Sequence, residues 1–335
     1  MSELVRIAVD AMGGDNAPGE IIRGAVDAVN ENPQISMFLV GQEDKILPLL
    51  TTLSYDAERL EVVHAPEVIE TGEPPVMAIR QKKDSSLVRA MYMVKEGKCD
   101  AYVSAGSTGA ILVGAQTIIG RIKGVSRAPL APLIPTRKGN SLLIDCGANV
   151  DARPVQLVQF AKIGSIYMEN VCGIKYPKVA LVNIGAEEEK GNALVRETYP
   201  LLKNCPDINF TGNIEARDIP AGEADVIVCE AFTGNVILKM YEGVATSLMA
   251  VLKDAMMQTT RGKIGGFLVR PSLRNALKDY DMNRYGGAPM LGLNGLVVKA
   301  HGSSNAQTFK NAIVQCIRFH ETRVGELIFN QLSEE

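Results

Sequence analysis

Short apolar runs alternate with segments whose apolar residues recur at helical spacing along most of the chain. The first run, 5–9, leads through a polar turn into 20–29, where apolar residues fall three and four positions apart. Further apolar runs follow at 35–40, 60–64, 100–103, 141–144, 178–183, 207–210, 224–228 and 296–299. This alternation predicts a mostly parallel sheet with helices on both faces, that is, a three-layer Rossmann-like α/β fold.

The turn after the first predicted strand is rich in glycine and acidic residues. It reads Asp10-Ala-Met-Gly-Gly-Asp-Asn-Ala-Pro18 and precedes a predicted helix. A strand, a glycine turn and a helix in succession can present backbone N–H groups to an anion, here around Gly13 and Gly14. Asp10 and Asp15 are expected to orient backbone groups, a hydroxyl or a cationic partner. The alternative is a tight turn in which Asp15 caps the helix.

A second turn of this kind follows the strand expected at 100–103. Small residues let a backbone approach a ligand closely, and hydroxyls add hydrogen-bond donors. The turn lacks both the G-x-G-x-x-G spacing and the lysine of a P-loop, so it predicts a small-anion site rather than a nucleotide site. A simple helix cap is the alternative. Its candidate binding residues are Ser104, Gly106, Ser107, Thr108 and Gly109.

Polar turns also follow later strands. Asn149 closes the turn Asp145-Cys-Gly-Ala-Asn149, and Lys190 and Asn192 stand at a helix start. The run 224–228 is followed by Thr233, Gly234 and Asn235. The carboxyl ends of parallel strands lie at one edge of a sheet, so we expect these turns to converge on one cleft.

The last predicted strand ends in Lys299-Ala-His-Gly-Ser-Ser304. His301, Gly302, Ser303 and Ser304 could together face an anion with an imidazole, hydroxyls and backbone N–H groups. A histidine with a purely structural role is the alternative. Lys299 or Lys190 would supply positive charge.

Composition narrows the class of protein. The chain has 335 residues and a net charge of −3, which does not favour nucleic-acid binding. Its six cysteines form no C-x-x-C pair, and its three histidines form no H-E-x-x-H motif. We therefore expect reduced thiols in the cytoplasm and no metal site. No apolar run is long enough to predict a membrane span.

A protruding helical hairpin is expected at about 236–285. We expect a long helix to about residue 260 and a short second helix at 272–277. Apolar residues flanked by cations suit an anionic membrane surface or an acidic protein; a dimer interface is the alternative. The residues assigned to membrane or carrier-protein contact are Arg261, Lys263, Ile264, Phe267, Leu268, Val269 and Arg270.

Six motifs in order resemble those of the bacterial phosphate acyltransferase (PlsX) family. They are Asp10-Ala-Met-Gly-Gly-Asp15, Ser104-Ala-Gly-Ser-Thr-Gly109, Asp145-Cys-Gly-Ala-Asn149, Phe232-Thr-Gly-Asn235, Tyr285-Gly-Gly-Ala288 and Lys299-Ala-His-Gly-Ser-Ser304. The resemblance covers essentially the whole chain. It implies a homodimer of single α/β domains spanning 1–335, similar in fold to phosphate acetyltransferases and the isocitrate/isopropylmalate dehydrogenase group.

The same resemblance implies transfer of a long acyl chain from acyl carrier protein to inorganic phosphate, with no cofactor. The product, acyl phosphate, is the donor for the membrane enzyme that acylates glycerol 3-phosphate in phospholipid synthesis. A cytoplasmic protein in peripheral contact with the membrane and with that enzyme is implied. The chain departs from the family at Asn16, where His is frequent, and at Glu230-Ala231, where Asp-Gly is common.

The chemistry expected from the residues is direct attack of bound phosphate on the thioester carbonyl. Neither a G-x-S-x-G elbow nor a Cys–His nucleophile pair is evident. We expect phosphate to bind against 104–109 and 301–304, with His301, Lys190, Lys299 and Asp10 as catalytic candidates. Two alternatives stay open: a short-chain phosphate acetyl- or butyryltransferase-like enzyme, and a non-catalytic scaffold that binds acyl carrier protein or membrane. A dehydrogenase would need a dinucleotide fingerprint that the sequence lacks.

Overall fold

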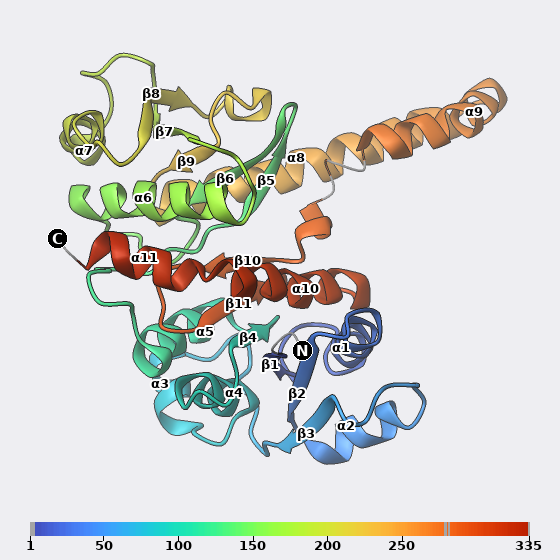
Figure 1. Cartoon of the computed structure of the whole chain (residues 1–335). Coiled ribbons are helices and arrows are strands. Elements are labelled where there is room, and N and C mark those ends of the chain that lie inside the picture. Colours follow the sequence, from blue (N-terminus) through green and yellow to red (C-terminus); the bar gives the residue numbers. More distant parts are fainter. Residues whose placement is uncertain (1–3, 278–279, 281, 334–335) are drawn as a thin grey trace. The chain divides into compact units, whose positions relative to one another are not determined.

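The computed structural model describes residues 4–277, 280 and 282–333. The chain divides into two compact units. Unit 1 comprises Met1–Pro132, Lys162–Tyr176 and Asn283–Glu335, and unit 2 comprises Leu133–Ala161 and Pro177–Met282. Each unit is built on its own mostly parallel sheet with helices packed against it (Figure 1), which confirms the predicted α/β class.

Unit 1 contains a six-stranded sheet in the order β10-β11-β4-β1-β2-β3. The strands β1, β2, β3, β4 and β11 run parallel, whereas β10 pairs antiparallel with β11 at the edge. Their bounds are Val5–Asp10 (β1), Ile35–Gly41 (β2), Leu60–His64 (β3), Ala101–Ser104 (β4), Gly287–Met290 (β10) and Leu296–Ala300 (β11). The carboxyl ends of β1, β4 and β11 are therefore neighbours, and each is followed by a predicted ligand-binding turn.

The helices of unit 1 include the one predicted at 20–29, and others that the apolar pattern did not predict. They are α1 (Gly19–Glu31), α2 (Glu43–Leu50), α3 (Pro75–Gln81), α4 (Ser86–Lys95), α5 (Thr108–Gly114), α10 (Ala306–Thr322) and α11 (Val324–Leu332). A π-helical turn, Ala115–Ile119, continues α5.

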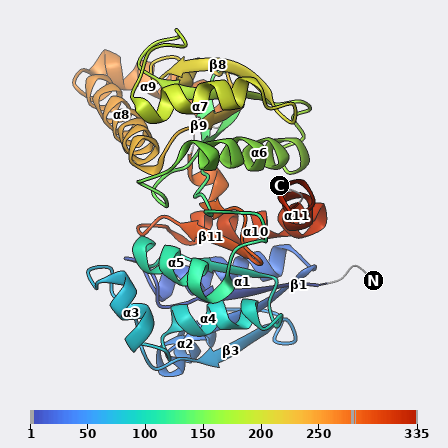
Figure 2. The same ribbon diagram turned by 90° about the vertical axis from the view of Figure 1, so that its left-hand side faces the viewer.

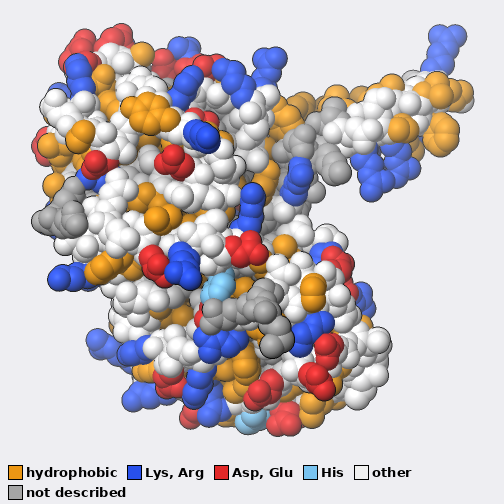
Figure 3. All heavy atoms as spheres, viewed as in Figure 1, with side chains coloured by type: hydrophobic (Ala, Val, Ile, Leu, Met, Phe, Trp, Pro, Cys, Tyr) orange, Lys and Arg blue, Asp and Glu red, His pale blue; other side chains and the backbone are white. Residues whose placement is uncertain are grey.

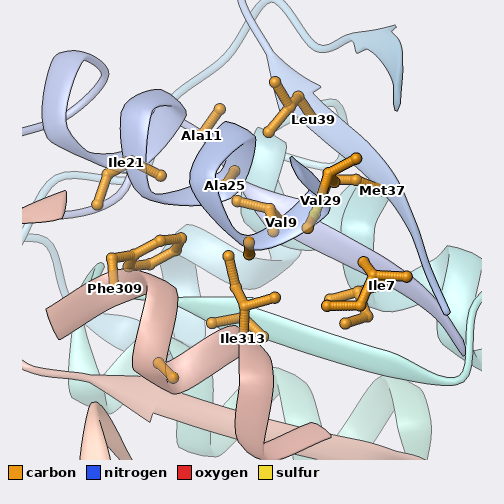
Figure 4. Packing of buried hydrophobic residues seen from close by; sticks show 14 of the residues in the cluster. Ile7, Val9, Ala11, Ile21, Ala25, Val29, Met37, Leu39, Phe309 and Ile313 are labelled. Carbon is orange, nitrogen blue, oxygen red and sulfur yellow. The ribbon is translucent and has the colours of Figure 1, made fainter. Parts of the chain in front are cut away.

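The two faces of the unit 1 sheet receive different side chains of β1. Ile7 and Val9 pack in one core with Phe309 and Ile313 beneath α1 and α10 (Figure 4). Side chains alternate between the two faces along a strand, so Asp10 points to the opposite face. There α4 packs on β1, β2 and β4. The strand period thus directs the buried carboxylate toward α4.

Unit 2 contains a five-stranded sheet in the order β5-β6-β9-β7-β8. Its strands are β5 (Leu133–Thr136), β6 (Gly139–Ile144), β7 (Lys178–Asn183), β8 (Asn209–Glu215) and β9 (Val226–Val228), with β5 antiparallel at the edge. Helix α7 (Ala193–Lys203) packs on β7 and β8 (Figure 2). Helix α6 (Pro154–Asn170) begins in unit 2, and its second half is assigned to unit 1.

Two long helices, α8 (Ala231–Met257) and α9 (Thr260–Leu277), extend beyond the sheet of unit 2 (Figure 1). The expected short helix at 272–277 is wrong, because one continuous helix contains Gly265, Gly266 and Pro271. The two helices pack closely, since Gly262 and Gly266 both lie against Met256. By length and composition alone α8 could cross a membrane, contrary to the expectation that no segment could.

Candidate active site

Asp10 is a buried carboxylate at the end of β1. Its Oδ1 accepts hydrogen bonds from Ser86 Oγ at 2.6 Å and from the Met12 N–H at 3.2 Å, and its Oδ2 accepts one from Ser104 Oγ at 2.7 Å. Burial raises the pKa of the Asp10 carboxyl, and the hydrogen bonds oppose this rise. All of these partners are neutral donors, so the hydrogen bonds favour the ionised carboxylate whereas burial disfavours it.

Ser104 couples Asp10 to the second glycine turn. Its hydroxyl donates to Asp10 and accepts from the Gly106 N–H at 2.9 Å, so both directions of the hydroxyl are used. Ser104 is fully buried at the end of β4. Ser104 therefore has a structural role, because its side chain sets the path of the turn 104–109. Its role as a direct ligand stays a prediction. Ser107 then caps α5 by accepting from the Ala110 N–H at 3.4 Å.

Gly13 and Gly14 allow the first and second turns to touch. A Cβ at Gly13 would lie 2.5 Å from Asp10 Oδ2, 2.8 Å from the Gly106 nitrogen and 2.8 Å from Ser104 Oγ. At Gly14, where φ is +111°, a Cβ would lie 2.8 Å from the Ala105 Cβ. The two glycines are therefore required by close packing at both positions and by backbone conformation at the second.

The third turn, 301–304, is held against the first by hydrogen bonds. The Asp15 N–H donates to the Gly302 carbonyl at 2.8 Å, and Asn16 Nδ2 donates to the Ser303 and Ser304 carbonyls at 3.1 Å each. Asn16, where the family often has His, therefore positions a turn. The predicted convergence is observed for the turns after β1, β4 and β11.

His301 is exposed, and its ring orientation is fixed within its own turn. Nδ1 accepts from the Ser303 N–H at 3.2 Å and lies 2.8 Å from Ser303 Oγ. A nitrogen that accepts a backbone N–H carries no proton, so the neutral imidazole carries its proton on Nε2. His301 can therefore donate a hydrogen bond from Nε2 to an anion.

Ser304 and Lys299 are both buried near the carboxyl end of β11. The Ser304 hydroxyl is one of the buried polar atoms that lack a hydrogen-bond partner among the described residues. Lys299 pairs in register with Ser104 across the sheet, and its Nζ donates to the Ala300 carbonyl. A buried hydroxyl without a partner among the described residues can accept from or donate to a small polar ligand.

The predicted residues of unit 2 are largely engaged within their own turns. Asn192 caps α7 by accepting from the Val195 N–H at 2.9 Å. Lys190 Nζ lies 2.7 Å from Glu187 Oε1, and this carboxylate raises the pKa of Lys190. Asn149 Nδ2 donates to Asp145 Oδ2 at 2.7 Å.

Helix α8 begins with a carboxylate cap. Glu230 accepts from the Phe232 N–H at 2.6 Å and the Thr233 N–H at 3.1 Å, and the Thr233 hydroxyl also donates to it. The longer carboxylate at the family's Asp position thus reaches the helix end. Gly234 lies against the Asp145 carbonyl, 1.9 Å from a would-be Cβ, while Asn235 is exposed.

The predicted contact residues of the hairpin are solvent-exposed apolar and basic side chains. Ile264, Phe267, Leu268 and Val269 are 60, 75, 69 and 48% exposed. Arg261, Lys263 and Arg270 complete the set on the same helix, and Figure 3 shows apolar and basic side chains together at the end of the hairpin.

Sequence reasoning missed Ser86 as part of the site. It opens α4, and its bond to Asp10 joins residues 76 positions apart. A serine at a helix start is typical of a cap, and Ser85 fills that role by accepting from the Val88 N–H. Only the alternation of side chains on β1 hints that Asp10 faces α4.

A cavity of about 700 Å³ lies elsewhere in unit 1. It opens at the amino ends of the strands and is lined by Val5, Asp100, Leu296 and His320 among others. None of the predicted site residues lines it. Ligands of parallel α/β sheets gather at the carboxyl ends, so the turns are the better candidate site.

Comparison with solved structures defines the class of fold. A phosphotransacetylase from Streptococcus pyogenes is similar with a TM-score of 0.64 at 19% identity, covering 96% of this chain and 95% of that chain. A branched-chain phosphotransacylase from Enterococcus faecalis V583 is similar with a TM-score of 0.54 at 14% identity, covering 94% and 99%. The chain therefore has the fold seen in these two structures.

Sequence relatives then define the family. The model of a family described as "Fatty acid synthesis protein" matches residues 5–327. A phosphate acyltransferase from Clostridium acetobutylicum is 49% identical over 328 residues, covering 98% of this chain and 99% of the relative, and one from Clostridium botulinum is 51% identical over 326 residues, covering 97% of each. The chain belongs to the phosphate acyltransferase (PlsX) family and is an acyltransferase.

Proposed function

We propose that the enzyme transfers a long-chain acyl group from acyl carrier protein to inorganic phosphate. The observation that carries the phosphate assignment is the buried Ser304 hydroxyl, which has no partner among the described residues and lies in a turn bonded to the Gly13-Gly14 loop. The Ala306 N–H at the start of α10 already donates to Glu20, so this helix end is occupied. Phosphate would therefore bind through turn 301–304. Both units would act as one phosphate acyltransferase domain.

Direct attack by phosphate is the chemistry that these residues support. A phosphate oxygen forms a bond to the thioester carbonyl carbon, the C–S bond breaks, and the thiolate leaves and takes a proton as free carrier thiol. His301 would donate from Nε2 to phosphate, and Lys299 and Lys190 are the cationic candidates for charge neutralisation. Trapping an acyl-enzyme from acyl donor without phosphate would exclude this scheme.

The donor separates this proposal from its two alternatives. We expect acyl phosphate to form fastest from palmitoyl-acyl carrier protein, more slowly from palmitoyl-coenzyme A, and hardly at all from acetyl- or butyryl-coenzyme A. The measurement is acyl phosphate trapped by hydroxylamine for each donor. Preference for the short donors would favour the acetyltransferase-like enzyme, and binding of carrier protein without any product would favour the scaffold.

The hairpin is proposed as the surface for the membrane and for acidic acyl carrier protein. Phe267 and Leu268 are 75 and 69% exposed and are flanked by Lys263 and Arg270. Apolar side chains beside cations bind anionic lipid surfaces. Such contact would bring acyl phosphate to the membrane enzyme that acylates glycerol 3-phosphate and keep the protein cytoplasmic but peripherally bound.

Replacing Phe267 and Leu268 by Asp is expected to release the protein from phosphatidylglycerol vesicles. Each side chain contributes about 1.5–3 kcal/mol on full burial, so the partition constant should fall about tenfold or more. Co-sedimentation measures it, with Leu201→Asp on α7 as the control, since Leu201 is 44% exposed. Activity on carrier-protein donor in solution should persist. Equal vesicle binding by wild type and variant would refute the membrane role.

A homodimer is also proposed, following the family. Val244, Leu248 and Val251 on α8 are 52, 57 and 64% exposed, which provides an apolar face for a second copy. Sedimentation velocity should show a dimer at micromolar concentration, and a monomer throughout would contradict it.

A further inference from the structure

Three large apolar side chains of unit 2 are exposed on two loops and at the start of helix α8. Val150, Ile184 and Phe232 are 57, 79 and 66% exposed. We name these three residues the strand-end patch. Large apolar residues grouped on a surface commonly mark binding sites.

The three residues follow neighbouring parallel strands. β9 pairs in parallel with β6 on one side and β7 on the other, and the patch residues come after β6, β7 and β9 respectively. The Ala231 N–H donates to the Asn149 carbonyl at 3.1 Å. Val150 and Phe232 are the residues that follow the two partners of this hydrogen bond in the sequence. The patch therefore lies at the carboxyl edge of the unit 2 sheet, where α/β proteins place ligands.

Several polar side chains at this edge make hydrogen bonds within their own turns. Asn183 accepts from the Ile184 N–H at 2.8 Å and donates to the Lys190 carbonyl at 3.1 Å. Asn149 donates to Asp145, and Glu230 caps α8. With these groups engaged, Val150, Ile184 and Phe232 are the large apolar side chains exposed at this edge, next to the exposed acidic run Glu187–Glu189 in the loop after β7.

The strand-end patch continues along α8. Val236 and Met240 follow Phe232 at intervals of four residues, which places all three on one face of the helix. They are 51 and 67% exposed. An extended apolar strip of this kind suits a flexible hydrocarbon chain rather than a compact polar ligand, and methionine adapts to chains of different shape.

We propose that the strand-end patch binds the acyl chain of the donor and sets the preference for chain length. The occupant follows from the reaction: a phosphate acyltransferase must hold an acyl group, and the turns of unit 1 offer glycines and polar side chains instead. The inference rests on the proposed function for the identity of the donor as a long-chain thioester.

A tryptophan reporter tests occupancy independently of catalysis. The sequence contains no tryptophan, so Phe232→Trp creates a single fluorophore in the strand-end patch. Palmitoyl-acyl carrier protein should shift its emission to shorter wavelength, whereas Leu201→Trp on α7 should not respond. An emission that changes with protein concentration and not with acyl donor would show that a second copy covers the patch, and would overturn the proposal, as would no response.

Chain-length profiles test specificity. For Phe232→Ala and Ile184→Ser, the ratio of kcat/KM for palmitoyl over octanoyl donors should fall about tenfold. The loss of apolar contact should lower kcat/KM more for the longer chain than for the shorter one. Leu201→Ala should keep the wild-type ratio. An equal loss on both donors would overturn the inference and leave the proposed function standing. If the wild type is inactive on both donors, the proposed function is refuted instead. The fluorescence of Phe232→Trp would then still test whether the strand-end patch binds an acyl chain.

Discussion

Asp10→Asn is expected to lower kcat about a hundredfold while the fold is kept. A displacement of about 1 Å in a turn that positions substrate has an effect of this size. The carboxylate accepts from Ser86 on one oxygen and from Ser104 on the other. An amide has one acceptor oxygen and a donor nitrogen, so one hydroxyl would face a donor. If that hydroxyl is Ser104, its proton loses the acceptor that Asp10 Oδ2 provides, so the side chain must rotate and turn 104–109, tied to Ser104 Oγ through the Gly106 N–H, would shift.

The same variant should remove a pH dependence of stability. Burial raises the pKa of Asp10 in the folded protein above its ordinary value of 3.8, so the folded state holds this proton more tightly than the unfolded state does. Above pH 3.8 the contribution of Asp10 to stability therefore falls as pH rises through the raised pKa. Relative to Asp10→Asn, the wild type should gain stability as pH falls through the raised pKa of Asp10, which urea unfolding at a series of pH values measures.

Three serine variants control this experiment. Ser86→Ala removes one donor to Asp10 and should impair activity, whereas Ser86→Thr keeps the hydroxyl and should restore it. Ser85→Ala removes the cap of α4 and a hydrogen bond to the Lys82 carbonyl, neither of which involves Asp10, and should lower stability without a change in the pH profile of kcat. Full activity of Asp10→Asn at every pH would contradict a role for the carboxylate.

Gly13→Ala is expected to abolish most activity by steric conflict. The added methyl would lie 2.5 Å from Asp10 Oδ2 and 2.8 Å from both the Gly106 nitrogen and Ser104 Oγ. Hydrogen bonds fix all three atoms, so the turns must separate, and we expect a loss of about 1–3 kcal/mol in unfolding free energy. The measurements are phosphate-saturation kinetics and thermal unfolding.

Gly19→Ala is the matched control, because a Cβ at the first residue of α1 would meet nothing within 4 Å. It should retain wild-type KM for phosphate and equal or higher stability. Wild-type kinetics for Gly13→Ala would show that the contact of the first two turns is not needed for phosphate binding.

Much of unit 1 was predictable because its strands are buried on both faces and end in polar glycine turns. The run 5–9 became β1, and the turns at 10–18, 104–109 and 301–304 meet as predicted. Their convergence follows from the parallel pairing of β1, β4 and β11. Local pattern and topology agree here, so the sequence alone predicts β1 and the convergence of these turns.

Other features depend on pairings that a local pattern does not contain. The edge strands β5 and β10 are four residues long and hold Pro135 and Pro289, which edge strands tolerate and which obscure a strand pattern. Helix α9 runs through glycines and a proline against Met256. Ser86 joins Asp10 only through the fold, and the exposure of Phe232 depends on the packing of α8.

Phosphate dependence of thiol release from palmitoyl-acyl carrier protein tests the central claim most directly. Free thiol and hydroxylamine-trapped acyl phosphate should appear together, in equal amounts and only with phosphate present. Release of thiol without phosphate would contradict direct transfer and indicate hydrolysis or an acyl-enzyme.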